Sequence, residues 1–166
     1  ALSARQPARW VLKWIRRLPT GLDCLDFGCG RARYSCELAT TAKTVTLVDS
    51  TSQLRRLSTI SGIRMNIFEF CDCSTAMSCV PAESFSDTDR YDLALCLNVL
   101  SAIPSYQERH SVMAKVLAAL RTGGVALFSN QYRNTYFKTY RSRSDVVPHL
   151  DGWLIPQGSA FTFYGI

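Results

Sequence analysis

Two carboxylates stand at the ends of two apolar segments near the start of the chain. Residues 25–30 read Leu-Asp-Phe-Gly-Cys-Gly, and residues 47–49 read Leu-Val-Asp. A strand that turns through Gly-x-Gly into a helix allows the backbone to pass very close to a ligand. The sequence therefore predicts a ligand site in which Asp26, the glycine turn and Asp49 take part.

The residues around the glycine turn distinguish between two kinds of ligand. A dinucleotide requires Gly-x-Gly-x-x-Gly, with its pyrophosphate on the helix N-terminus. Arg33 occupies the last glycine position, and Asp26 is poorly placed for an anionic pyrophosphate. A ligand with an ammonium group and a ribose but no phosphate fits better, with Asp26 near the cation and Asp49 on the ribose hydroxyls. An NAD-dependent oxidoreductase is the weaker alternative.

Strand-like and helix-like segments alternate along the chain and predict how these residues are positioned. Strands are expected at 22–27, 44–48, 64–70, 91–97 and 125–129, and helices at 10–18, 33–41, 51–60 and 105–120. Residues 71–90 are polar and irregular, and two further short strands are expected at 153–156 and 160–164. This alternation predicts a mostly parallel sheet with helices on both faces and a ligand beyond the carboxyl ends of its strands.

Five segments, in order, resemble motifs of the class I S-adenosylmethionine-dependent methyltransferases. They are Leu25-Asp26-Phe27-Gly28-Cys29-Gly30, Asp49, Cys71-Asp72-Cys73, the stretch from Tyr91-Asp92-Leu93 to Pro104, and Leu120-Arg121-Thr122-Gly123-Gly124. The resemblance runs from about Leu22 to Ser129. It implies a Rossmann-like three-layer sandwich with a mostly parallel sheet of about seven strands, the last of them antiparallel.

The same resemblance implies S-adenosylmethionine as the cofactor and assigns roles to residues. Asp49 matches the ribose-binding acid, and Asp72 matches the position that contacts the adenine amine. The cofactor-binding residues expected on this basis are Asp26, Gly28, Cys29, Gly30, Asp49, Ser50, Asp72, Cys73, Asn98 and Val99. The signatures of amino-methylating DNA enzymes, cytosine-C5 enzymes and ribose 2′-O enzymes are not found.

No catalytic dyad stands out in the sequence. Methyl transfer from a sulfonium is an in-line displacement, so positioning supplies much of the catalysis. A general base is needed only for an acceptor whose proton has a high pKa. Tyr106, His110 and Tyr132 are the candidates for that role.

The length of 166 residues predicts a single domain. Residues 1–21 contain the predicted N-terminal helix, which we expect to form part of a substrate or cofactor lid. No apolar run approaches the ~18 residues that span a bilayer, so no membrane association is expected. The N-terminus lacks a secretory signal, and the odd number of cysteines (seven) favours reduced thiols, which together predict a cytoplasmic protein. The cysteine and histidine spacing predicts no metal site.

The identity of the methyl acceptor is left open by the sequence. The net charge of +6 is compatible with an anionic partner such as RNA or DNA, but the chain has little beyond the core with which to grip a polymer. A small-molecule acceptor is therefore slightly favoured over a nucleic acid. A non-catalytic S-adenosylmethionine-binding module of a larger chain or complex is the remaining hypothesis.

Overall fold

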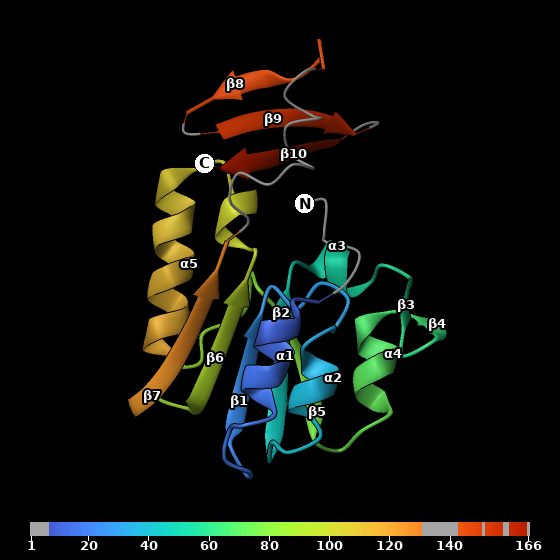
Figure 1. The fold of residues 1–166 in the computed structure, drawn as a ribbon, viewed down its shortest axis with the longest axis vertical. Coiled ribbons are helices and arrows are strands. Elements are labelled where there is room, and N and C mark those ends of the chain that lie inside the picture. The colour runs from blue at the N-terminus through green and yellow to red at the C-terminus, as the bar shows by residue number, and fades with distance from the viewer. Residues whose placement is uncertain (1–6, 131–142, 151, 158–159, 166) are drawn as a thin grey trace.

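A sheet of five parallel strands lies at the centre of the computed structural model, which describes residues 7–130, 143–150, 152–157 and 160–165 (Figure 1). The strands are β1 (Asp23–Phe27), β2 (Thr44–Asp49), β5 (Met77–Pro81), β6 (Tyr91–Leu97) and β7 (Leu120–Ser129), in the order β5-β2-β1-β6-β7. The chain moves outward from β1 to β5 and then returns to β6. The strand order therefore reverses between β1 and β6, where open parallel sheets bind ligands.

Helices cover both faces of this sheet. The first face packs against α1 (Arg9–Ile15), α2 (Ser35–Leu38), α3 (Thr51–Leu54) and α4 (Ile67–Asp72), and the second against α5 (Tyr106–Ala118). Alternate residues of each strand point to opposite faces. In β1, Cys24 joins the core beneath α1 to α4, whereas Leu25 and Phe27 join the core beneath α5. The predicted three-layer, mostly parallel fold is confirmed.

The segment after β2 differs from its prediction. The expected helix at 51–60 ends at Leu54, and Ser58–Ile60 instead forms strand β3, which pairs antiparallel with β4 (Ile63–Met65). The strand expected at 64–70 is also wrong, because residues 67–72 form α4. Asn66 and Glu69 cap this helix reciprocally, and Ile67, Phe70 and Cys71 bury one helical stripe.

The third strand of the sheet lies in the stretch that was expected to be irregular. It is β5, and it pairs with β2 from Val45↔Met77 to Asp49↔Pro81. Its residues are only half-buried or exposed, as befits an edge strand. The run Met-Ser-Cys-Val-Pro therefore lacks the continuous apolar character by which buried parallel strands are recognised.

The C-terminal strands form a separate sheet. β8 (Val147–His149), β9 (Gly152–Gln157) and β10 (Ala160–Gly165) pair antiparallel, which confirms the two short strands expected there. Figure 1 shows this sheet beyond the carboxyl ends of β6 and β7, and β10 contacts the 3₁₀ turn η1 (Leu100–Ala102). Among the described residues, the central sheet thus has five strands rather than about seven, and it has no antiparallel member.

None of the helices in the described part of the chain is long and apolar enough to cross a membrane.

Candidate functional site

The glycine turn after β1 is bonded to the end of β2. Gly28 and Gly30 have positive φ angles of 79° and 57°. The N–H groups of Gly28 and Cys29 both donate to the Val48 carbonyl, at 2.6 and 3.1 Å. The turn therefore closes directly over the neighbouring strand, and its backbone takes a conformation that glycine adopts without strain.

Gly28 also lies in close contact with the segment that follows β6. A methyl group added at Gly28 would overlap the side chain of Val99, whereas one added at Gly30 would meet only the Gly28 carbonyl, at 4.0 Å. Glycine is therefore required at position 28 by space and by φ, and at position 30 by φ alone. The structure brings Gly28 and Val99 together, as expected for two residues beside the strand reversal.

Asp49 links the end of β2 to the glycine turn. Its Oδ2 accepts a 2.9 Å hydrogen bond from the Gly30 N–H, and its Oδ1 accepts a 2.8 Å bond from the Ser50 N–H. Burial raises the pKa of this carboxyl, and the two N–H donors partly oppose that shift. Each oxygen accepts one of these bonds and keeps a second lone pair, so the carboxylate can still accept ligand hydroxyls.

Asp26 lies within β1, two residues before the glycine turn, and is buried. The residue is 2% exposed, and one of its oxygens accepts a 2.6 Å bond from the Ser35 hydroxyl of α2. Burial raises the pKa of Asp26 to about 6, the Ser35 bond lowers it, and the nearby charge of Asp49 raises it. A buried carboxylate of this kind is stabilised by a positive charge placed near it.

The loop after β6 supplies a third side of the candidate site. Asn98 has φ of 61°, and its N–H donates to the Ser129 carbonyl at the end of β7, at 2.6 Å. Val99 follows and precedes η1. Asn98 and Val99 thus lie at the same sheet edge as the glycine turn and Asp49.

Asp72 and Cys73 lie elsewhere, and the expectation that they follow a sheet strand is wrong. Asp72 is the last residue of α4, Cys73 is its C-cap, and both are exposed. The chain from α4 enters β5 at Met77, which pairs with Val45 at the start of β2. The end of α4 therefore faces the amino edge of the sheet, opposite Asp49.

Glu83 and Gln53 lie beside the candidate site and were not predicted from the sequence. Glu83 follows β5, and its carboxylate accepts 3.3 Å bonds from the N–H and the hydroxyl of Thr51. Gln53 lies in α3, and its Nε2 donates to the Gly30 carbonyl at 3.3 Å. Glu83 could be placed beside Asp49 only once β5 was known to be a strand. For Gln53, the sequence did contain a signal, namely the Ser-x-x-Gln spacing of a helix cap at residues 50–53.

The candidate bases do not join this group of contacts. Tyr106 and His110 lie on the exposed side of α5, with ring centroids 4.7 Å apart. Arg109 lies over the Tyr106 ring at 5.8 Å, so Tyr106 contacts both His110 and Arg109. Tyr132 is outside the described residues.

The cysteines are unpaired thiols. Burial raises the pKa of Cys29 well above its ordinary value and raises that of Cys96 to about 12, so neither is a reactive thiolate at neutral pH. Among the described residues, no cluster of three or more His, Cys, Asp or Glu side chains is arranged to hold a metal ion.

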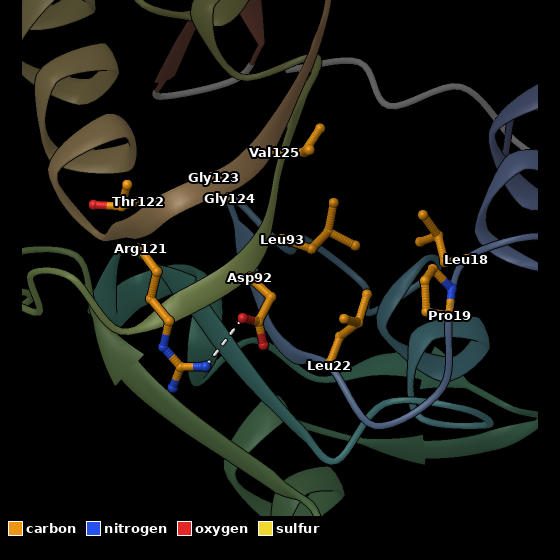
Figure 2. Close-up of a pocket in the computed structure, with 10 residues that line it drawn as sticks. All are labelled: Leu18, Pro19, Leu22, Asp92, Leu93, Arg121, Thr122, Gly123, Gly124 and Val125. Carbon is orange, nitrogen blue, oxygen red and sulfur yellow. Dashed lines mark hydrogen bonds and ion pairs between the residues drawn. The ribbon is translucent and has the colours of Figure 1, made fainter.

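A pocket of about 350 Å³ opens at the opposite, amino edge of the sheet (Figure 2). Leu18, Leu22, Leu93 and Val125 line its apolar wall, and Asp92 and Arg121 form an ion pair at 3.0 Å on another side. Arg121 also bonds Asp23, which ties the starts of β1, β6 and β7 together. None of the expected cofactor residues lines this pocket.

Comparison with known sequences gives a family match over most of the chain. The sequence model described as "Methyltransferase domain" matches residues 3–158. Uncharacterized protein YmfD of Escherichia coli (strain K12) is 34% identical over 164 residues, which are 96% of this chain and 72% of that protein. Ubiquinone biosynthesis O-methyltransferase of Bordetella avium is 27% identical over 138 residues, 80% of this chain and 53% of that protein.

Solved structures with the same fold have low sequence identity. A protein from Pyrococcus horikoshii OT3 superposes with a TM-score of 0.66 at 16% identity, over 94% of this chain and 70% of that chain. DhpI, in a complex with SAM and HEP, superposes with a TM-score of 0.61 at 16% identity, over 93% of this chain and 67% of that chain. These similarities independently support the three-layer fold.

Proposed function

Because this chain belongs to the methyltransferase domain family, whose methyl donor is S-adenosylmethionine, we propose that it methylates a small molecule at the carboxyl edge of its central sheet. One observation carries the location of the site. The glycine turn after β1 and the acid after β2 are joined by the Gly30–Asp49 hydrogen bond, beside the strand reversal. A Rossmann-like sheet binds its ligand at such a point.

The side chains at this edge fit the donor in charge and in hydrogen-bonding capacity. Asp49 keeps acceptor capacity for two ribose hydroxyls, since its two backbone bonds use one lone pair on each oxygen. Asp26 is a buried carboxylate just before the turn, and it would favour a cationic methionine portion near it. Gly28, Cys29, Gly30, Ser50, Asn98 and Val99 complete the proposed contacts.

We propose Glu83 in place of Asp72 at the adenine end of this site. Glu83 follows β5, which is the strand next to β2 and ends beside Asp49. Its two bonds to Thr51 leave each carboxylate oxygen a free lone pair, and its backbone and that of Thr51 lower its pKa. A carboxylate held ionised in this way can accept a hydrogen bond from an exocyclic amine.

When bound, S-adenosylmethionine supplies a methyl group that is already activated by its sulfonium leaving group. The residues of the chain then have to orient the reactants, and this orientation can remove a large part of the activation barrier for a displacement. No proton-transfer partner is required for an acceptor that is already deprotonated. Tyr106, His110 and Tyr132 stay predictions for the case in which the acceptor carries a proton of high pKa.

A small-molecule acceptor is supported by the extent of the chain around the site. The described residues beyond the central layers are the β3–β4 hairpin and the short β8–β10 sheet, which offer little surface to a polymer. One relative, over about half of its own length, is named for ubiquinone biosynthesis, which is a small-molecule pathway. We also propose a cytoplasmic location, which the seven unpaired thiols support.

Methyl-labelled S-adenosylmethionine, incubated with the protein and a fractionated cell extract, tests the proposal. We expect label in the small-molecule fraction together with S-adenosylhomocysteine. Label in RNA or DNA would replace the small-molecule acceptor with a nucleic acid. Binding of the donor without turnover in any fraction would identify a binding module instead of an enzyme.

A further inference from the structure

Helix α3 begins with residues that have the spacing of a capping box. Ser50 is its N-cap, and the Ser50 hydroxyl accepts a 3.4 Å bond from the Gln53 N–H. In a complete capping box, the Gln or Glu three residues after the cap returns its side chain to the N–H of the cap residue. Gln53 has the type and position for that bond.

Gln53 makes a different bond, although α4 of the same chain shows the complete pattern. In α4, the Glu69 carboxylate accepts from the Asn66 N–H at 2.9 Å, and Asn66 accepts from the Glu69 N–H at 3.0 Å. In α3, the Ser50 N–H is taken by Asp49. The side chain of Gln53 reaches the Gly30 carbonyl instead, across 23 residues of sequence.

Gly30 is consequently held on both sides of its Cα. Its N–H donates to Asp49, which fixes the peptide plane before it, and its carbonyl accepts from Gln53, which fixes the plane after it. Both partners belong to the unit formed by the end of β2 and the start of α3. The positive φ of Gly30 is therefore set by two hydrogen bonds that do not require a ligand.

We propose that Gln53 is a positioning residue that holds the glycine turn in its ligand-binding conformation. This inference rests on the proposed function, because it takes the ligand of the glycine turn to be S-adenosylmethionine. Without the Gln53 bond, the plane after Gly30 becomes free to rotate, and binding must then order it. Ordering a flexible backbone on binding lowers affinity without removing any contact to the ligand.

The first experiment needs no ligand and compares Gln53→Met with Glu69→Met, which removes the corresponding residue from α4. Amide hydrogen exchange at Gly30 is measured in both variants and in the unchanged protein. We expect Gln53→Met to speed exchange at Gly30 about three- to tenfold, the effect of one net hydrogen bond, and Glu69→Met to leave it unchanged. Equal exchange at Gly30 in all three proteins would overturn the proposal.

The second experiment measures S-adenosylmethionine affinity by calorimetry for the same variants and for Gln53→Glu. Gln53→Met should weaken binding about three- to tenfold, and Glu69→Met should not change it. Gln53→Glu should bind more weakly than Gln53→Met at pH 8, because its carboxylate faces the Gly30 carbonyl. Relative to the unchanged protein, it should recover as the pH falls below about 4.3, the ordinary pKa of a Glu carboxyl, because a protonated carboxyl can donate.

The outcomes separate the inference from the proposed function. If S-adenosylmethionine binds the unchanged protein and Gln53→Met with equal affinity, only the role of Gln53 is contradicted, and the proposed function stands. Absence of binding to the unchanged protein contradicts the proposed function, while the exchange rate at Gly30 still decides the role of Gln53.

Discussion

The backbone N–H of Gly30 donates a 2.9 Å hydrogen bond to Oδ2 of Asp49. This bond joins the turn after the first strand of the sheet to the residue that ends the second strand. Its acceptor is a half-buried carboxylate, and hydrogen bonds to charged groups are stronger than those between neutral groups. The pair therefore fixes the shape of the proposed cofactor site before any ligand binds.

Asp49→Asn should weaken S-adenosylmethionine binding about 10- to 100-fold, as measured by calorimetry. Gly30 and Ser50 donate to different oxygens of Asp49, and an amide replaces one of these oxygens with an NH₂ group that cannot accept. One of the two bonds is therefore lost, and the other loses the contribution of the charge. Asp72→Asn is the matched control, because Asp72 lies at the end of α4 near the opposite edge of the sheet. A similar loss for both variants would contradict the assignment of the site.

Gly28→Ala should destabilise the protein more than Gly62→Ala does, as measured by chemical unfolding. Both glycines have a positive φ, at 79° and 87°, so both substitutions cost about 1 kcal/mol or more from the backbone. Only at Gly28 does the added methyl also overlap Val99, whereas a methyl added at Gly62 would meet no atom beyond its chain neighbours within 4 Å. Equal losses of stability would mean that the contact between the turn and Val99 does not constrain the fold.

Asp26→Asn should raise stability at pH 7.5 and weaken cofactor binding. The pKa of Asp26 in the folded protein is about 6, above its ordinary value of 3.8, so this group's contribution to stability is present below about pH 4 and is lost as the pH rises through 6. The substitution keeps an acceptor for Ser35 and removes the buried charge. We expect a gain on the order of 1–3 kcal/mol at pH 7.5 that disappears near pH 4.

Urea unfolding of the two proteins across pH 4–8 provides this measurement, and the difference between them cancels the titration of other groups. A constant difference over the whole range would contradict a raised pKa at Asp26. Cofactor affinity measured at pH 7.5 should fall, because the positive charge of the ligand loses its buried counter-charge.

Val125→Trp should leave cofactor affinity within about twofold of the unchanged protein, because the substitution alters no proposed cofactor contact. A twofold change is well below the tenfold change that about 1.4 kcal/mol of binding free energy produces. Val125 is 53% exposed and lines the pocket at the amino edge of the sheet, so an indole there occupies part of that pocket. A large loss of affinity would place the cofactor in this pocket rather than at the glycine turn.

The sequence predicts the parts of the fold in which local pattern and tertiary role agree. The strands that end at Phe27 and Asp49 are apolar and are buried in the middle of the sheet, and both were expected at nearly these bounds. Their ends carry the glycine turn and Asp49, which the structure brings together as the sequence predicts, and their role in ligand binding stays a prediction. The helix that begins after Ser105 was also predicted, because its cap and apolar spacing are local features.

The remaining part was not predictable because its signals are weak or compete with one another. β5 is an edge strand that contains Pro81 and only partly buried side chains, so its pattern resembles a loop. The alternation of residues 64–70 predicts a strand, but the capping box at Asn66 favours the helix observed at 67–72. Because the third strand was expected at 64–70, Asp72 was the acid expected after it. The observed third strand is β5, and the acid that follows it is Glu83. The bond from Gln53 to Gly30 depends on tertiary structure alone.

Amide chemical shifts recorded by NMR during titration with S-adenosylmethionine test the location of the site most directly. We expect shifts at Gly28, Gly30 and Ser50, where the turn and the end of β2 meet. We expect none at Gly123 and Gly124, which line the pocket at the other edge. Shifts confined to Gly123 and Gly124, or no saturable shifts at all, would contradict a cofactor site at the glycine turn.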